Sequence, residues 1–246
     1  MKTEISSPFQ VGVLSTLTYP LLPRLLQMLF EFRVAGVCVL LDAKLNSEKD
    51  LRIWQDRTKG AFDGGPTLYD FASHGLTLYP VESHNSADCV KLIKRLGLSL
   101  LINGGTPRKL SSDVLKSVRQ GVINVHPGLL PKYRGASCVE WAIYNDDRVG
   151  NTAHFMSEGY DEGPIIQTEA YDFSLVDTYT SIRVHVYRES LRLMGETVKK
   201  VIDQRLTPID GIEQGVGQLF SPISEEKMQR VLDKVAAKSY RYMRNA

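Results

Sequence analysis

Cysteine is scarce in this chain, and long apolar runs are absent. The 246 residues contain three cysteines, Cys38, Cys89 and Cys138, and no two of them form a CxxC pair. We therefore predict reduced thiols in a cytoplasmic protein. The longest apolar run, Val34–Leu41, is too short to cross a bilayer, so we expect no membrane association. The first ten residues lack the apolar core of a secretion signal.

An excess of one charge is also missing. The chain has 30 Lys and Arg against 28 Asp and Glu, a net charge of +2, which does not indicate a polyanion binder. We therefore expect no nucleic acid partner. The last predicted helix carries a basic stripe, for which a solvated helix face is the favoured explanation and an RNA or nucleotide contact the alternative. The stripe consists of Lys227, Arg230, Lys234, Lys238 and Arg241.

Short apolar runs alternate with amphipathic segments, which is typical of repeated strand–helix–strand units. Strands joined by helices in this way are parallel. Two later segments, Asn151–Met156 and Pro164–Ala170, flank a short acidic loop and predict an antiparallel hairpin. The predicted fold class is α/β, a doubly wound, mostly parallel sheet with an antiparallel edge hairpin. The predicted parallel strands are Val11–Ser15, Val34–Leu41, Leu76–Val81, Leu98–Ile102 and Val122–His126.

The domain prediction follows this alternation. Residues 1–204 form one domain that ends with a long helix, Thr178–Gln204. Residues of about 43–75 are an insertion, long for a strand connection, with one helix near Ser47–Lys59. Residues 205–246 are a linker, rich in Gly and Pro, followed by a helix over Glu225–Met243.

Candidate chemistry lies at the carboxyl end of the strand Val122–His126, where open parallel sheets bind ligands. Asn124 and His126 are two residues apart, so their side chains share one face of the strand. An amide donor beside an imidazole suits a reaction that passes through an oxyanion. Asp161 lies in the predicted hairpin loop, where its carboxylate would raise the pKa of a nearby His126.

Two ordered segments, NVHPGLLPKYRG from Asn124 and TAHFMSEGYDEGPII from Thr152, together resemble the folate-dependent formyltransferase family. Members include glycinamide ribonucleotide formyltransferase, the catalytic domain of methionyl-tRNA formyltransferase and sugar N-formyltransferases. The resemblance implies a Rossmann-like variant of the α/β fold and an Asn–His–Asp triad of Asn124, His126 and Asp161. It also implies 10-formyltetrahydrofolate as the one-carbon donor, with no metal.

The same resemblance implies where the pterin ring of the folate would bind. The first loop is Asn103–Leu110, in which Arg108 and Leu110 match pterin-contacting positions. The second is Met156–Asp161, with Met156, Ser157 and Tyr160 as the donor-contacting residues. The chain departs from the family at Gly128, where a serine is usual, and at Gly104–Gly105, which we expect to flatten the pocket wall.

These features predict an N-formyltransferase that acts on an amine of a small molecule. Sugar, amino-acid and nucleotide-linked amines all stay open, and the sequence predicts no oligomeric state. The alternatives are a formyltetrahydrofolate hydrolase, a glycinamide ribonucleotide formyltransferase and a non-catalytic folate-binding module. The loop Ser15–Pro20 lacks the glycines of a phosphate cradle, which counts against the ribonucleotide.

Overall fold

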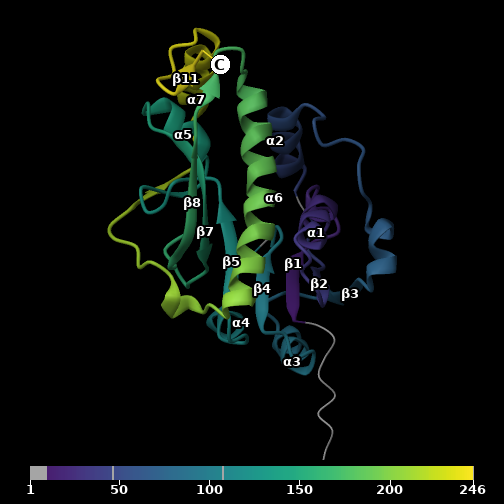
Figure 1. Ribbon diagram of the computed structural model, residues 1–246. Helices are drawn as coiled ribbons and strands as arrows, with labels where there is room; N and C mark the ends of the chain where they lie inside the picture. The colour runs from purple at the N-terminus through teal and green to yellow at the C-terminus, as the bar shows by residue number, and fades with distance from the viewer. Residues whose placement is uncertain (1–9, 46, 107, 246) are drawn as a thin grey trace, which may run out of the picture. The chain divides into compact units, whose positions relative to one another are not determined.

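A computed structural model describes residues 10–45, 47–106 and 108–245 (Figure 1). The absence of a secretion signal was predicted from the first ten residues, of which nine lie outside the described residues. Pro107, within the predicted pterin loop, lies outside them as well. Among the described residues, no helix is both long and apolar enough to cross a membrane.

Seven strands form the main sheet, and their bounds confirm most of the predicted positions. They are β1 (Val11–Ser15), β2 (Val37–Asp42), β3 (Thr77–Val81), β4 (Leu100–Asn103), β5 (Val122–His126), β7 (Val149–Phe155) and β8 (Ile165–Tyr171). Their order is β3-β2-β1-β4-β5-β7-β8. The pairs from β3 to β5 are parallel, whereas β7 and β8 are antiparallel. The predicted fold class is therefore confirmed.

The three helices whose ranges were predicted are among the α-helices of the described residues, with different ends. The α-helices are α1 (Leu22–Glu31), α2 (Glu48–Thr58), α3 (Ala87–Arg95), α4 (Ser112–Leu115), α5 (Cys138–Tyr144), α6 (Tyr179–Gln204) and α7 (Glu225–Ala236), with 3-10 helices η1 (Leu68–His74) and η2 (Pro208–Asp210). Ser86 caps α3, because its hydroxyl accepts the N–H of Cys89. Helix α4 is a single turn.

The chain divides into two compact units, and the boundary falls inside β5. The first unit holds residues up to Ser47, Gly64–Asn124 and Met194–Asp210. The second holds Glu48–Asp63, Val125–Leu193 and the chain from Gly211 onward. The predicted domain boundary after residue 204 stays a prediction. The insertion of about 43–75 contains the predicted helix as α2, but it is split between the units and also contains η1, which was not expected.

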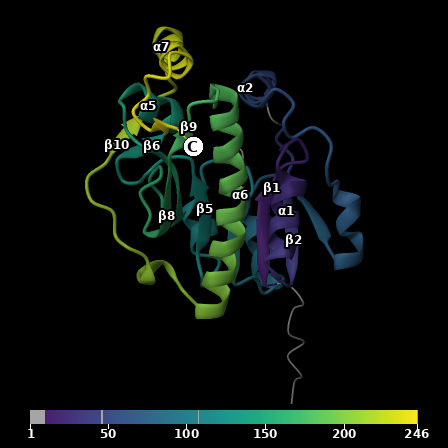
Figure 2. The same ribbon diagram turned by 45° about the horizontal axis from the view of Figure 1, so that its top comes forward.

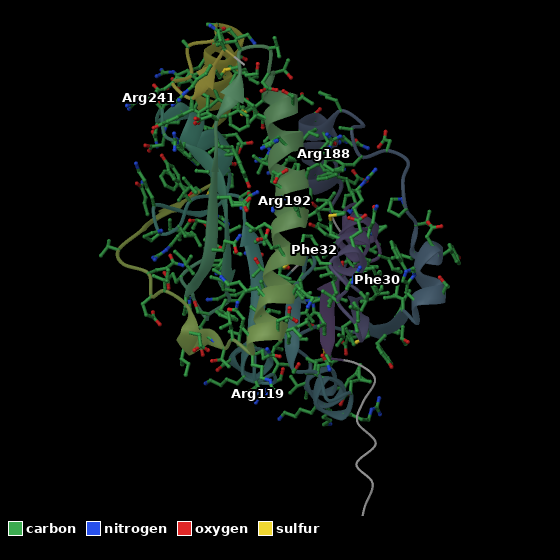
Figure 3. All side chains as sticks on the ribbon, viewed as in Figure 1. Phe30, Phe32, Arg119, Arg188, Arg192 and Arg241 are labelled. Atoms are coloured by element: carbon green, nitrogen blue, oxygen red, sulfur yellow. The ribbon has the colours of Figure 1, made fainter. Side chains whose placement is uncertain are left out.

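In the first unit, α1 lies beside β1 and β2 (Figures 1 and 2). Its apolar stripe of Leu22, Leu25, Leu26 and Leu29 is buried. The side chains of Phe30 and Phe32, near the end of α1, point in different directions (Figure 3). The ring of Phe30 stacks on Phe71 of η1 with centroids 5.5 Å apart. Phe32 packs so close to Gly195 that a Cβ there would lie 2.6 Å from its ring.

The second unit has its own core and two small sheets. Strand β6 (Tyr133–Gly135) pairs in parallel with β10 (Gln218–Phe220), and β9 (Phe173–Ser174) with β11 (Met243–Arg244). Figure 2 shows β10 and β6 next to each other near α5. The buried core joins Val139 and Ile143 of α5 to Val231 and Val235 of α7. The predicted linker therefore contains a strand, because the segment after Gly211 pairs with residues far back in the sequence.

The basic stripe of α7 is only partly a solvated face. The Nζ of Lys234 donates to the carbonyls of Ile143 and Tyr144, at 3.2 and 2.9 Å, and so caps the end of α5. The ammonium of Lys227 lies over the ring of Trp141, 4.6 Å from its centroid. These lysines hold α7 to its own unit, which the charge pattern alone did not indicate.

Candidate active site

Strand β5 brings the first two predicted catalytic residues to its carboxyl end. The strand runs from Val122 to His126, as predicted. Asn124 belongs to the first unit and His126 to the second. In the first unit, the Oδ1 of Asn124 accepts a hydrogen bond of 2.9 Å from the Nδ2 of Asn103. That bond fixes which end of the Asn124 amide is the acceptor and leaves its NH₂ group as the donor end.

The imidazole of His126 is buried and has protein groups at both nitrogens. Its Nε2 lies 2.8 Å from the carbonyl oxygen of Tyr133. Because a carbonyl only accepts, Nε2 carries a hydrogen and donates it. Its Nδ1 lies 3.4 Å from the Oδ2 of Asp161. The structure thus brings His126 and Asp161 together, 35 residues apart in sequence.

Asp161 sits in the loop between β7 and β8 and is held by several groups. Its Oδ2 accepts the backbone N–H of Gly135 at 2.9 Å. Its Oδ1 lies 3.6 Å from the Nε2 of His154. Its backbone φ is +54°, in the left-handed region that most residues avoid.

Burial and charge oppose each other in this pair. Burial lowers the pKa of His126 below its usual value, whereas the carboxylate of Asp161 raises it and His154 lowers it further. Burial alone would raise the pKa of Asp161, but His154, His126 and the N–H of Gly135 outweigh it and lower that pKa. The site therefore holds a neutral imidazole beside a carboxylate at neutral pH. The carboxylate of Asp161 raises the pKa of His126, as expected, but burial has the larger effect and the net pKa is lowered.

Gly128 permits the close packing around His126. A Cβ at Gly128 would lie 2.7 Å from both the Nε2 of His126 and the carbonyl oxygen of Tyr133. This explains physically why the usual serine is absent here. The hydroxyl of Thr152 donates to the carbonyl of Gly128 at 2.7 Å and accepts the N–H of Leu130 at 3.1 Å. Thr152 thus ties the loop after His126 to β7, a role that its sequence position gave no reason to expect.

The predicted pterin loop of the first unit is organised by a buried carboxylate. The guanidinium of Arg108 donates to Asp42 through Nε at 2.8 Å and through a terminal nitrogen at 2.9 Å. The backbone N–H groups of Lys44 and His84 donate to the same carboxylate. Burial acts to raise the pKa of Asp42, but these donors lower it to about 2. The charge of Arg108 is therefore already paired, and Leu110 is buried.

The glycine pair in this loop is explained by Tyr19. A Cβ at Gly105 would lie 2.4 Å from the Tyr19 ring, and one at Gly104 would lie 2.5 Å from Val13. A tyrosine ring therefore occupies the space beside Gly105, and the flatter pocket wall stays a prediction.

The second predicted donor loop lies in the other unit, beside Asp161. Met156 and Ser157 are half-buried, whereas Tyr160 is 58% exposed. The Ser157 hydroxyl is buried and has no hydrogen-bond partner among the described residues. A buried polar atom without a hydrogen-bond partner is unfavourable. The Ser157 hydroxyl therefore marks a place where a polar group of a ligand would supply the missing hydrogen bond.

One thiol, that of Cys138, lies near Asp161. Cys138 follows β6 and is buried. Burial raises the pKa of its thiol to about 12, so it is protonated and unreactive at neutral pH.

These observations define an α/β protein with an acid–base pair at the carboxyl end of a parallel sheet strand. A sequence model of the family described as formyl transferase matches residues 55–198, which is more than half of the chain. The chain belongs to the formyl transferase family, as its two ordered motifs predicted.

Individual relatives agree with this assignment. The chain is 35% identical to methionyl-tRNA formyltransferase of Trichodesmium erythraeum over 139 residues, 56% of this chain and 41% of that protein. It thus spans less than half of that relative. Glycinamide ribonucleotide transformylase 1 from Symbiobacterium toebii has a similar fold, with a TM-score of 0.60 at 21% identity, covering 80% of this chain and 89% of the other. An N-formyltransferase from Helicobacter canadensis, solved with folinic acid and dTDP-3-aminofucose, gives 0.57 at 14%, covering 89% and 72%.

Proposed function

We propose that this protein transfers a formyl group from 10-formyltetrahydrofolate to the amine of a small molecule. The observation that carries the proposal is the buried pair of His126 and Asp161, which lies in the two motifs shared with the family. In the reaction, a bond forms between the amine nitrogen and the formyl carbon. The bond between that carbon and the folate nitrogen breaks, the amine loses a proton, and the released folate nitrogen gains one.

The donor site is proposed on both predicted loops. Arg108 and Leu110 belong to the first loop, whose shape is set by the ion pair of Arg108 with Asp42. We expect backbone groups of this loop to contact the pterin ring, since the guanidinium is already paired. Met156, Ser157 and Tyr160 belong to the second loop, where the unpartnered Ser157 hydroxyl suits a ring nitrogen or oxygen. The folinic acid bound to the Helicobacter canadensis protein supports a folate at such a site.

Each triad residue has a role that follows from its surroundings. The Asn124 amide, oriented by Asn103, donates to the negative charge that develops on the formyl oxygen. The neutral imidazole of His126 and the carboxylate of Asp161 together take up the proton that the amine loses. His126 stays fixed through its Nε2 hydrogen bond to Tyr133, so the proton enters at Nδ1, between imidazole and carboxylate.

We propose that the start of α1 does not bind a phosphate group of the acceptor. The backbone N–H of Tyr19 donates to Thr16, and that of Leu22 donates to Tyr19. Pro20 and Pro23 have no N–H to offer. Few amides of this loop therefore point outward to bind an anion. We expect negligible activity on glycinamide ribonucleotide, the acceptor suggested by one structural neighbour's name.

The test is an acceptor panel incubated with 10-formyltetrahydrofolate and read by the mass gain of one formyl group. The panel holds amino sugars, nucleotide-linked amino sugars, amino acids, glycinamide ribonucleotide and methionyl-tRNA. Replacement of Asn124, His126 or Asp161 by Ala should each slow turnover by at least about 100-fold. Asp88→Asn, which changes an exposed carboxylate, is the matched control and should behave as wild type.

The outcomes separate the rival functions. Loss of 10-formyltetrahydrofolate at the same rate without any acceptor would identify a hydrolase. Folate binding without turnover of any acceptor would identify a binding module. Full activity in both Asn124→Ala and His126→Ala would refute the proposed mechanism.

A further inference from the structure

The turn that carries Asp161 needs outside support. Its φ of +54° is unfavourable for a residue with a side chain, so the surroundings must hold it. The position of the carboxylate beside His126 therefore depends on contacts that reach this turn from other parts of the chain.

Gln214 makes such a contact from 53 residues away in sequence. Its Nε2 donates to the carbonyl oxygen of Asp161 at 3.0 Å and to that of Gly163 at 2.6 Å. One side-chain amide thus bridges two carbonyls on the two sides of the turn. Those carbonyls belong to the backbone that sets the direction of the Asp161 side chain.

Gln214 is itself fixed by its other end. Its Oε1 accepts hydrogen bonds from the guanidinium of Arg134, at 3.2 Å from Nε and 2.9 Å from a terminal nitrogen. The Arg134 side chain is 11% exposed and lies on β6, next to Gly135, whose N–H holds the Asp161 carboxylate. Strand β6 therefore holds both parts of Asp161. Arg134 holds the backbone of the turn through Gln214, and the N–H of Gly135 holds the carboxylate.

The chain around Gln214 is anchored on both sides. Ile212 and Ile165 exchange two backbone hydrogen bonds of 2.8 Å. Further along, Gly217 lies against the loop after His126, where a Cβ would meet the carbonyl oxygen of Pro131 at 2.0 Å. No side chain fits at Gly217 without moving this segment. The amide of Gln214 is thus presented to the turn from a fixed backbone.

We propose that Gln214 is a positioning residue that keeps the carboxylate of Asp161 beside His126. The proposal rests on the proposed role of Asp161 in formyl transfer. Gln214 acts through the backbone of the turn and touches no reacting atom. Its contribution is to keep the carboxylate of Asp161 close to the imidazole of His126.

The decisive measurement is the pKa of His126 in the full chain, by NMR with labelled histidine. His126→Ala assigns the signal among the five histidines. Asp161 and His154 are the charged or titratable groups that face the ring, and both stay in the variants. Gln214→Met removes the donor without adding charge, so the pKa of His126 should fall toward its value in Asp161→Asn. We expect kcat to fall at least about tenfold with the donor KM within about twofold, as for a displaced catalytic group.

Two further variants keep the test decisive. Gln214→Glu retains an acceptor for Arg134 but lacks the donor to the two carbonyls, and should lose kcat as Gln214→Met does. Gly217→Ala moves the segment while Gln214 stays intact, and should lower the pKa of His126 in the same direction. The matched controls are Gln218→Met, an exposed glutamine nearby, and Gly215→Ala, where a Cβ meets nothing within 4 Å. Both should match wild type.

An unchanged pKa of His126 in Gln214→Met, or wild-type kcat in Gln214→Glu, would overturn the proposal. A failure of the proposed function looks different. In that case the wild type transfers no formyl group, while the NMR measurement still decides whether Gln214 positions Asp161.

Discussion

Replacement of Asp161 by Asn tests the electrostatics of the acid–base pair directly. The Nδ1 of His126 and the Oδ2 of Asp161 are 3.4 Å apart, and their side chains are 5% and 17% exposed. The carboxylate raises the pKa of His126 against the effect of burial. Removing the charge while keeping the shape should therefore lower that pKa, and each pKa unit of the fall corresponds to about 1.4 kcal/mol.

The same reasoning fixes the pH dependence of stability. Burial already holds the pKa of His126 below its unfolded value, so the unfolded chain takes up a proton before the native chain does. The contribution of His126 to stability is full above pH ~6.5 and is lost as the pH falls, by at most about 1.4 kcal/mol per pH unit. In Asp161→Asn the native pKa is lower still, so this acid loss extends to lower pH.

The assay is an NMR titration of His126 in both proteins, together with urea unfolding at pH 7.5 and 5.5. Asp88→Asn, an exposed carboxylate distant in sequence, serves as the control for a change of net charge. A pKa of His126 that stays constant or rises in Asp161→Asn would refute the electrostatic coupling. The proposed proton uptake by the pair would then have no physical basis.

Two further predictions concern close packing and buried charge. Gly128→Ala should destabilise the fold by about 1–3 kcal/mol, because its Cβ would overlap His126 and Tyr133; urea unfolding measures this, and a wild-type free energy of unfolding would contradict it. Glu140 is fully buried, with its Oε1 3.3 Å from Arg57 and 3.7 Å from Arg183. Glu140→Gln should cost about 3–5 kcal/mol in thermal or urea unfolding, because buried Arg183 loses its counter-charge. Glu140→Met with Arg183→Met should recover most of that loss, and equal stabilities of the single and double variants would contradict the reasoning.

The parts of the fold that sequence predicts well are those with a strong local period. Strand β5 and the hairpin of β7 and β8 lie where apolar alternation placed them. Strand β10 was missed, because its three residues follow Gly217 and gain their partners only from β6. Short strands of this kind have no periodic signal of their own.

The candidate site shows the same division. The two motifs predicted that His126 and Asp161 are neighbours, and the Nδ1 of His126 lies 3.4 Å from the Oδ2 of Asp161. The sign of the net pKa change of His126 did not follow, since the degree of burial depends on the whole unit. Arg108 pairs with Asp42 across 66 residues, and Gln214 reaches Asp161 across 53. Such partners are set by tertiary packing, which no local pattern contains.

The carboxylate of Asp42 has a consequence for anyone who exchanges loops between members of this family. It accepts hydrogen bonds from Arg108 within the loop and from the backbone of Lys44 and His84 outside it. The loop and Asp42 therefore have to be exchanged together, although Arg108 and Asp42 are 66 residues apart in the sequence. A chimaera that imports a loop without an arginine at position 108 would strand a buried negative charge. A graft that is compatible with this scaffold must therefore keep both members of the ion pair, Arg108 in the loop and Asp42 outside it.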